Sequence, residues 1–152
     1  YLKYEKSTKL PKLMGYQAVG AAPLVSGMPV EKPETIASAI RIGNPASWEG
    51  AISARNESGG AIDSVTDEEI LEAYRLLSSK EGIFCEPASA ASLAGLIKTN
   101  SQNPNSIKSK TIVCVVTGSG LKEPELAEKQ FTTKPIQIKP ELDIVKETIM
   151  NL

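Results

Sequence analysis

The sequence predicts an α/β fold, a three-layer sandwich in which a parallel sheet lies between layers of helices. The main evidence is a strand-to-helix turn that occurs three times, at residues 40–48, 83–92 and 111–120. Each copy carries different residues at its tip, namely Gly-Asn-Pro, Glu-Pro-Ala and Thr-Gly-Ser-Gly. Ligands of open parallel sheets bind outside the carboxyl ends of the strands, so we expect any site at these turns.

The N-terminal half of the chain is predicted to supply two strands and two helices. A strand is expected over residues 12–25, and its small residues would let another part of the chain approach its backbone closely. A short helix is expected over residues 33–40. Asn44 is a suitable N-cap for a second helix, with Pro45 at its first position. Residues 61–65 then alternate in the manner of a strand.

The next helix is the best specified of the chain. Thr66 and Glu69 have the spacing of a capping box, in which each side chain accepts a hydrogen bond from the other residue's backbone N–H. Gly82 marks the C-terminal end of this helix. The residues expected to form its buried stripe are Ile70, Leu71, Tyr74 and Leu77.

The remaining elements lie between the second turn and the C-terminus. An alanine-rich helix is expected over residues 87–98, and a strand over residues 110–116 that is apolar on both faces, as when helices cover both sides of a sheet. Residues 135–138 are predicted to form an edge strand, and Pro140 to open a terminal helix. We therefore expect a main domain over residues 1–130 and an extension over residues 131–152.

Composition excludes several classes of function. The chain has 152 residues, with 17 basic and 18 acidic residues and a formal net charge of −1, which gives no electrostatic basis for binding nucleic acid or an anionic membrane. No apolar run approaches the roughly 20 residues of a membrane span. The sequence contains no histidine, which removes Ser-His-Asp and Cys-His catalysis. Cys85 and Cys114 form no CxxC pair, so we expect reduced thiols and no metal site.

Five segments resemble threonine synthases. They are PKLMGYQA with GAAP (residues 11–23), ETIASAIRIGNPASW (34–48), VTDEEI (65–70), EGIFCEPASAASLAGL (81–96) and VTGSGLKEP (116–124). The resemblance implies a fold-type-II pyridoxal-phosphate enzyme that converts O-phospho-L-homoserine and water to L-threonine and phosphate. It implies that this chain is the C-terminal half of the large domain, in an enzyme that is commonly a homodimer. It also implies a cytoplasmic location, or the plastid stroma if the source is a plant.

Two parts of the family's site have no match in this sequence. The Ser-Lys motif that holds the cofactor covalently and the asparagine-glycine phosphate loop both belong to earlier segments of the family's chains. Lys12, Lys98 and Lys122 stand in other contexts, and the sequence begins with Tyr1, not with methionine. We therefore expect a truncated product that contains no catalytic residue and has no turnover by itself.

The resemblance implies four cofactor-binding residues. Thr117 matches the family's contact with the pyridine nitrogen, and Glu86 matches a glutamate near the ring. Ala39 and Ile40 match the segment whose backbone lies against the ring face. A hydroxyl cannot protonate the nitrogen as an aspartate does, because its pKa is far too high. The ring stays neutral and is then a weaker electron sink, which suits elimination and replacement better than transamination.

From the residues alone, each of these positions has a second interpretation. Thr117 could simply end a strand, Glu86 could be a favourable charge at a helix N-terminus, and Ala39 could be an ordinary core residue. Ser89 is expected either near the ring or in hydrogen bonds of the first helical turn. Arg41 is expected either to bind substrate phosphate or to point away from the site.

Ser119 and the N–H groups of residues 118–121 suggest a phosphate cradle, but the family binds phosphate elsewhere, which favours close packing near the ring. Two alternative functions also remain open. One is a non-catalytic binding module that keeps the fold. The other is a fragment of a serine/threonine dehydratase, which shares the Glu-Pro-Ala turn, although the RIGNPASW run of residues 41–48 differs from dehydratases.

Overall fold

The structure is a computed structural model that describes residues 2–130 and 136–151. Its strands are β1 (Met14–Ala18) and β2 (Ala61–Val65). Its α-helices are α1 (Pro23–Ser26), α2 (Trp48–Ser58), α3 (Asp67–Glu81), α4 (Pro87–Gln102), α5 (Pro124–Gln130) and α6 (Leu142–Met150). Short 3-10 helices are η1 (Leu2–Tyr4), η2 (Val19–Ala21), η3 (Ser38–Ile40) and η4 (Gly120–Lys122).

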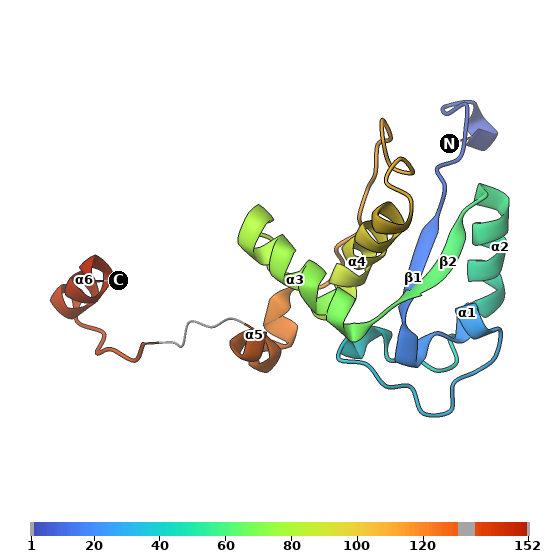
Figure 1. Cartoon of the computed structure of the whole chain (residues 1–152). Coiled ribbons are helices and arrows are strands. Elements are labelled where there is room, and N and C mark those ends of the chain that lie inside the picture. Colours follow the sequence, from blue (N-terminus) through green and yellow to red (C-terminus); the bar gives the residue numbers. More distant parts are fainter. Residues whose placement is uncertain (1, 131–135, 152) are drawn as a thin grey trace.

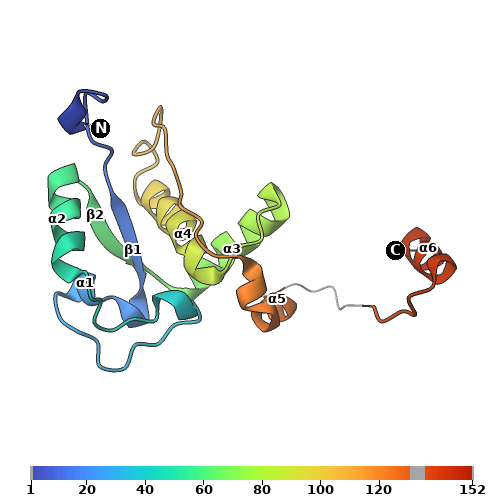
Figure 2. The same ribbon diagram turned by 180° about the vertical axis from the view of Figure 1, so that it is seen from behind.

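The predicted three-layer arrangement is present. Strands β1 and β2 pair in parallel, with Met14 opposite Ala61 and Ala18 opposite Val65. Figures 1 and 2 show this sheet between α1 and α2 on one side and α3 and α4 on the other. A parallel pair needs a long crossover, which here contains α1 and α2.

The core lies where α4 packs on the sheet and on α3. It contains many small side chains, so backbones approach closely; its buried members include Ala18, Val65, Ile70, Ala73, Tyr74, Leu77, Ala90, Ala91 and Ala94. At Gly95 of α4, an added Cβ would overlap the ring of Tyr16 on β1. The Tyr16 hydroxyl is also hydrogen-bonded to Thr99 Oγ1 at 2.9 Å. The alanine- and glycine-rich sequence of α4 therefore sets how near this helix lies to the sheet.

Helix α3 begins and ends as predicted. Thr66 Oγ1 accepts a hydrogen bond from Glu69 N at 3.2 Å, and Glu69 Oε2 accepts one from Thr66 N at 2.8 Å. Gly82 ends the helix in the left-handed region, at φ 66°. The buried stripe contains Ile70, Tyr74 and Leu77 as expected, but Ala73 is buried where Leu71 had been predicted.

Three predictions for the N-terminal half were wrong. Residues 23–25 lie in helix α1 and not in a strand, because Gln17 Oε1 accepts a hydrogen bond from Leu24 N at 2.9 Å. This bond gives a partner to an N–H group in the first turn of the short helix. Of the helix predicted over residues 33–40, only residues 38–40 are helical, as the 3-10 helix η3. Helix α2 begins at Trp48 and not after Asn44, since Val30 N donates to the carbonyl of Gly43 at 2.8 Å and holds that segment in a loop.

The two later strands that the sequence predicted are not formed within the described residues. Residues 83–85 contribute one bridge, between Cys85 and Ser119, and residues 110–116 run extended without a strand partner. An apolar strand needs neighbours on both edges and both faces to be buried. Val113 is instead 82% exposed.

The C-terminal segment has one described helix. Residues 136–138 form no strand, and the rest of the predicted edge strand lies outside the described residues. Helix α6 begins at Leu142, two residues after Pro140. In Figures 1 and 2 this helix lies apart from the sheet and from the helices that pack on it. Among the described helices, none has the length and apolar character needed to cross a membrane.

Candidate functional site

A cavity of about 250 Å³ lies between β1, the N-terminal turn of α4 and the extended segment before Thr117. Its lining residues are Met14, Tyr16, Ala39, Ile40, Glu86, Ala88, Ser89, Ala91, Ser92, Val115 and Thr117. All four predicted cofactor-binding residues, which come from three separate parts of the chain, therefore line a single cavity. Their roles toward a cofactor stay predictions.

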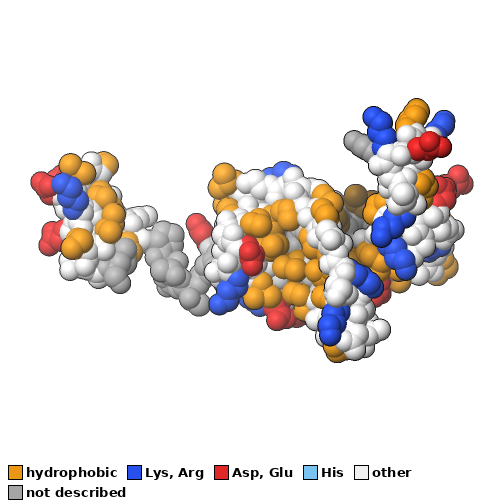
Figure 3. Space-filling view, turned by 90° about the horizontal axis from the view of Figure 1, so that it is seen from above, with side chains coloured by type: hydrophobic (Ala, Val, Ile, Leu, Met, Phe, Trp, Pro, Cys, Tyr) orange, Lys and Arg blue, Asp and Glu red, His pale blue; other side chains and the backbone are white. Residues whose placement is uncertain are grey.

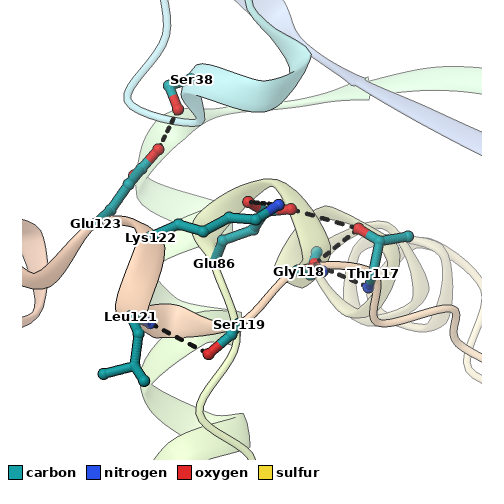
Figure 4. Close-up of polar contacts among 9 residues, drawn as sticks. Ser38, Glu86, Thr117, Gly118, Ser119, Leu121, Lys122 and Glu123 are labelled. Atoms are coloured by element: carbon teal, nitrogen blue, oxygen red, sulfur yellow. Dashed lines mark hydrogen bonds and ion pairs between the residues drawn. The ribbon is translucent and has the colours of Figure 1, made fainter.

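Glu86 is the N-cap residue of α4 and is buried, with 4% of its surface exposed. Its carboxylate makes no capping hydrogen bond. Instead, Glu86 Oε2 lies 3.2 Å from Lys122 Nζ, and Oε1 accepts a long 3.5 Å hydrogen bond from the Thr117 hydroxyl (Figure 4). The carboxylate is thus directed at Lys122 and Thr117 and not at the helix N-terminus.

Ser89, on the first turn of α4, connects this helix to the turn that follows the extended segment. Its Oγ accepts hydrogen bonds from Thr117 N at 3.0 Å and from Gly118 N at 2.9 Å. It also lies 3.0 Å from Thr117 Oγ1. Because these partners lie 28 and 29 residues along the chain, Ser89 does more than complete its own helical turn.

Glycines make the 117–120 turn compact. Glu86 N donates to the carbonyl of Gly118 at 2.9 Å, and a Cβ on Gly118 would overlap the Glu86 carboxylate. Gly120 N donates to the carbonyl of Phe84 at 3.1 Å, and a Cβ there would overlap the Phe84 ring. The N–H groups of Gly118, Gly120 and Leu121 have protein partners, which agrees with close packing of the turn rather than a phosphate cradle. Ser119 Oγ accepts from Leu121 N at 3.3 Å.

The wall formed by Ala39 and Ile40 is held from two sides. Asp67 accepts hydrogen bonds from the Thr35 hydroxyl at 2.5 Å and from Ile36 N at 3.0 Å, which holds that segment in a non-helical conformation before η3 begins. Ser38 Oγ donates to a carboxylate oxygen of Glu123, beside η4 (Figure 4).

Arg41 does not line the described cavity. Its Nε donates to the carbonyl of Thr35 at 2.9 Å. The structure therefore gives this side chain a partner on its own loop, which agrees with the interpretation that it points away.

Two further reactive side chains, Cys85 and Lys98, are neutral or paired. Burial, with the neighbouring Glu86 carboxylate, raises the pKa of the Cys85 thiol, so that thiol stays protonated at neutral pH. Lys98 pairs with Asp63 at 3.2 Å and donates to the carbonyl of Ser64. The described residues contain no group of three or more carboxylate or thiol side chains that could hold a metal ion.

Sequence reasoning missed three features of the site. Tyr16 and Met14 share the inner face of β1, and their spacing of two residues is the signal that could have identified them. The Ser89 hydrogen bonds and the Lys122–Glu86 pair had no such signal, because each joins residues brought together only by folding.

A wider and more open hollow of about 440 Å³ lies before and along the first turn of α2. One continuous segment, residues 44–50, lines it, and Glu49 is its one ionisable side chain. Since no distant element contributes to this hollow, it does not collect functional groups as the first cavity does.

Two solved structures share the fold of this chain. Maize serine racemase aligns with a TM-score of 0.60 and 19% identity, over 78% of this chain and 38% of that one. An L-serine ammonia-lyase from Rhizomucor miehei aligns with a TM-score of 0.62 and 20% identity, over 86% of this chain and 44% of that one. The architecture is that of a fold-type-II enzyme domain.

The chain belongs to the family described as "Pyridoxal-phosphate dependent enzyme", whose sequence profile matches residues 1–118. The cofactor of this family is pyridoxal phosphate.

Curated relatives of this chain include threonine synthases. The protein of Synechocystis is 50% identical over 98% of this chain and 38% of its own length. That of Halalkalibacterium halodurans is 54% identical over 86% of this chain and 37% of its own length. That of Methanocaldococcus jannaschii is 45% identical over 95% of this chain and 37% of its own length. The chain thus spans less than two fifths of the length of these relatives.

Proposed function

We propose that this chain is the C-terminal part of a threonine synthase, which converts O-phospho-L-homoserine and water to L-threonine and phosphate. The observation that carries the proposal is the identity of 50% to a threonine synthase over 98% of the chain. The geometry adds support, because Ala39, Ile40, Glu86 and Thr117 line one cavity.

The cavity fits the ring side of pyridoxal phosphate. Small and apolar groups of Ala39, Ile40, Ala88 and Ala91 provide a surface suited to a flat ring, and the Thr117 hydroxyl provides a polar group at its edge. The lining contains no lysine and no arginine. In this proposal, the covalent lysine and the phosphate contacts come from a part of the parent enzyme outside this sequence, so this chain has no turnover alone.

Each residue then has a defined task. Pyridoxal phosphate, when bound, supplies an electron sink for bonds to the substrate's carbon atoms. Thr117 would donate a hydrogen bond to the ring nitrogen and leave it neutral, because a hydroxyl is too weak an acid to transfer its proton. Ala39 and Ile40 would exclude water from the ring face. Lys122 compensates the buried charge of Glu86, which would otherwise be costly in this cavity.

The first test concerns the chain alone. When it is mixed with pyridoxal phosphate and reduced with borohydride, we expect no single lysine to be labelled stoichiometrically. Lys122 is the lysine whose labelling is most informative, because its Nζ lies 3.2 Å from the Glu86 carboxylate at the cavity while its side chain is 61% exposed. The Lys122→Arg variant should give the same scattered labelling. The Synechocystis relative is the positive control, and one uniquely labelled lysine in this chain would contradict the proposed division of the site.

The second test uses the longer enzyme that contains this sequence. Thr117→Ala should weaken cofactor retention and threonine formation while the fold stays intact, because one directed hydrogen bond worth about 0.5–1.5 kcal/mol is lost. That loss corresponds to roughly 2- to 12-fold in cofactor affinity. Thr117→Asp should move the ring toward its protonated state and increase side reactions. The matched control is Ser101→Ala, at the exposed end of α4. Unchanged kinetics and cofactor spectra in both Thr117 variants would remove Thr117 from the site.

A further inference from the structure

The hydroxyl of Ser89 has more hydrogen-bond partners than a simple helical turn requires. It accepts from Thr117 N at 3.0 Å and from Gly118 N at 2.9 Å, and its oxygen lies 3.0 Å from Thr117 Oγ1. Ser89 is buried, with 3% of its surface exposed. This group has no solvent to substitute for any of the three protein partners.

The number of lone pairs decides the direction of the hydroxyl–hydroxyl bond. A serine hydroxyl offers one proton and two lone pairs. The N–H groups of Thr117 and Gly118 can act only as donors, so they occupy both lone pairs of Ser89 Oγ. The bond between the two hydroxyls must then carry the proton of Ser89, with Thr117 Oγ1 as its acceptor.

We infer that Ser89 is a positioning residue that makes Thr117 a hydrogen-bond donor toward the cavity. Once Thr117 Oγ1 accepts from Ser89, its own proton is free to point elsewhere. Its other partner among the described residues is Glu86 Oε1, at 3.5 Å, which is a long and weak contact. A ligand atom in the cavity that accepts a hydrogen bond can therefore compete for this proton.

The direction of this bond selects the protonation state of the ligand. If Thr117 donated to Ser89, it would present only lone pairs to the cavity and would favour a protonated ring nitrogen. With the direction inferred here, the Thr117 proton favours an unprotonated, pyridine-type nitrogen. The identity of that ligand rests on the proposed function, whereas the direction of the bond rests only on the described hydrogen bonds.

The inference can be tested in the isolated chain, without cofactor, by carbon-13 NMR in an equal mixture of H₂O and D₂O. A slowly exchanging hydroxyl splits the signal of its Cβ into two lines, one for OH and one for OD. We expect two lines for Ser89 and one averaged line for Thr117. A single averaged line for Ser89 would overturn the inference. If self-association broadens the spectra, they are recorded with Val113→Lys, a change at an exposed position.

Variants distinguish a directed proton from a merely structural contact. Thr117→Val removes the acceptor but keeps the backbone N–H, so Ser89 should lose its second line while the amide of Gly118 stays protected from exchange. Thr117→Ser should restore the two lines, and Ser101→Ala, at the exposed end of α4, should not change them. Two lines for Ser89 in Thr117→Val would show that its proton points elsewhere.

A further variant checks the contact itself and covers the case in which Thr117→Val does not fold. Ser89→Ala should accelerate amide exchange at both Thr117 and Gly118, because both N–H groups lose their acceptor. Unchanged exchange at both amides would overturn the inference. Failure of pyridoxal phosphate to bind the longer enzyme would defeat the proposed function but would not alter any of these measurements.

Discussion

Gly95→Ala should lower the free energy of unfolding by about 1–3 kcal/mol, the usual range for overpacking a tight core. The added methyl group would overlap the ring of Tyr16, so either α4 must move away from β1 or the ring must leave its position. Moving the ring would also break the hydrogen bond between Tyr16 and Thr99. Urea unfolding followed by circular dichroism measures the change.

Gly50→Ala is the matched control for this substitution. Gly50 is the third residue of α2, is exposed, and has nothing within 4 Å of an added Cβ. Alanine should therefore stabilise the chain there by about 0.5–1 kcal/mol through its helix propensity. Equal stability of Gly95→Ala and the unaltered chain would mean that the contact between α4 and β1 is looser than described.

The isolated chain should self-associate through its exposed apolar segment. Val113 and Val115 are 82% and 65% exposed on an extended segment that has no strand partner among the described residues. Figure 3 shows hydrophobic side chains gathered in the middle of one face of the body. Unpaired strand edges and large apolar patches both promote association. Sedimentation should therefore give a mass that rises with concentration.

Val113→Lys should weaken this association at least about tenfold, because an unpaired charge buried in the contact costs more than 1.4 kcal/mol. The same substitution at Val19, an exposed valine outside the segment, serves as control. A monodisperse monomer at high concentration that unfolds cooperatively would show a self-sufficient domain. The alternative of a stand-alone binding module would then be favoured.

Elements defined by local contacts could be predicted from the sequence. Helix α3 is the clearest example, since its capping box joins Thr66 and Glu69, three residues apart, and Gly82 ends it by adopting a left-handed conformation. Strand β2 was predicted with its observed bounds, Ala61–Val65. For α3 the decisive interactions lie within a few residues along the chain, whereas β2 combines a local alternating pattern with pairing to the distant strand β1.

The wrong predictions depended on distant partners. Residues 110–116 have the composition of a central strand, but a strand forms only when a neighbour accepts and donates its backbone hydrogen bonds, and none does so among the described residues. Residues 33–40 have a helical pattern, yet the Asp67 carboxylate, about thirty residues away, holds Thr35 and Ile36 in a non-helical conformation.

The candidate site shows the same division. The resemblance to threonine synthases identified Ala39, Ile40, Glu86 and Thr117, and by itself the sequence determined the residue types that such a cavity requires. Only the tertiary structure placed Lys122 beside Glu86 and gave Ser89 its two backbone donors. The physical reason is that residue type sets which hydrogen bonds a side chain can form, whereas the direction of those bonds depends on partners brought close by folding.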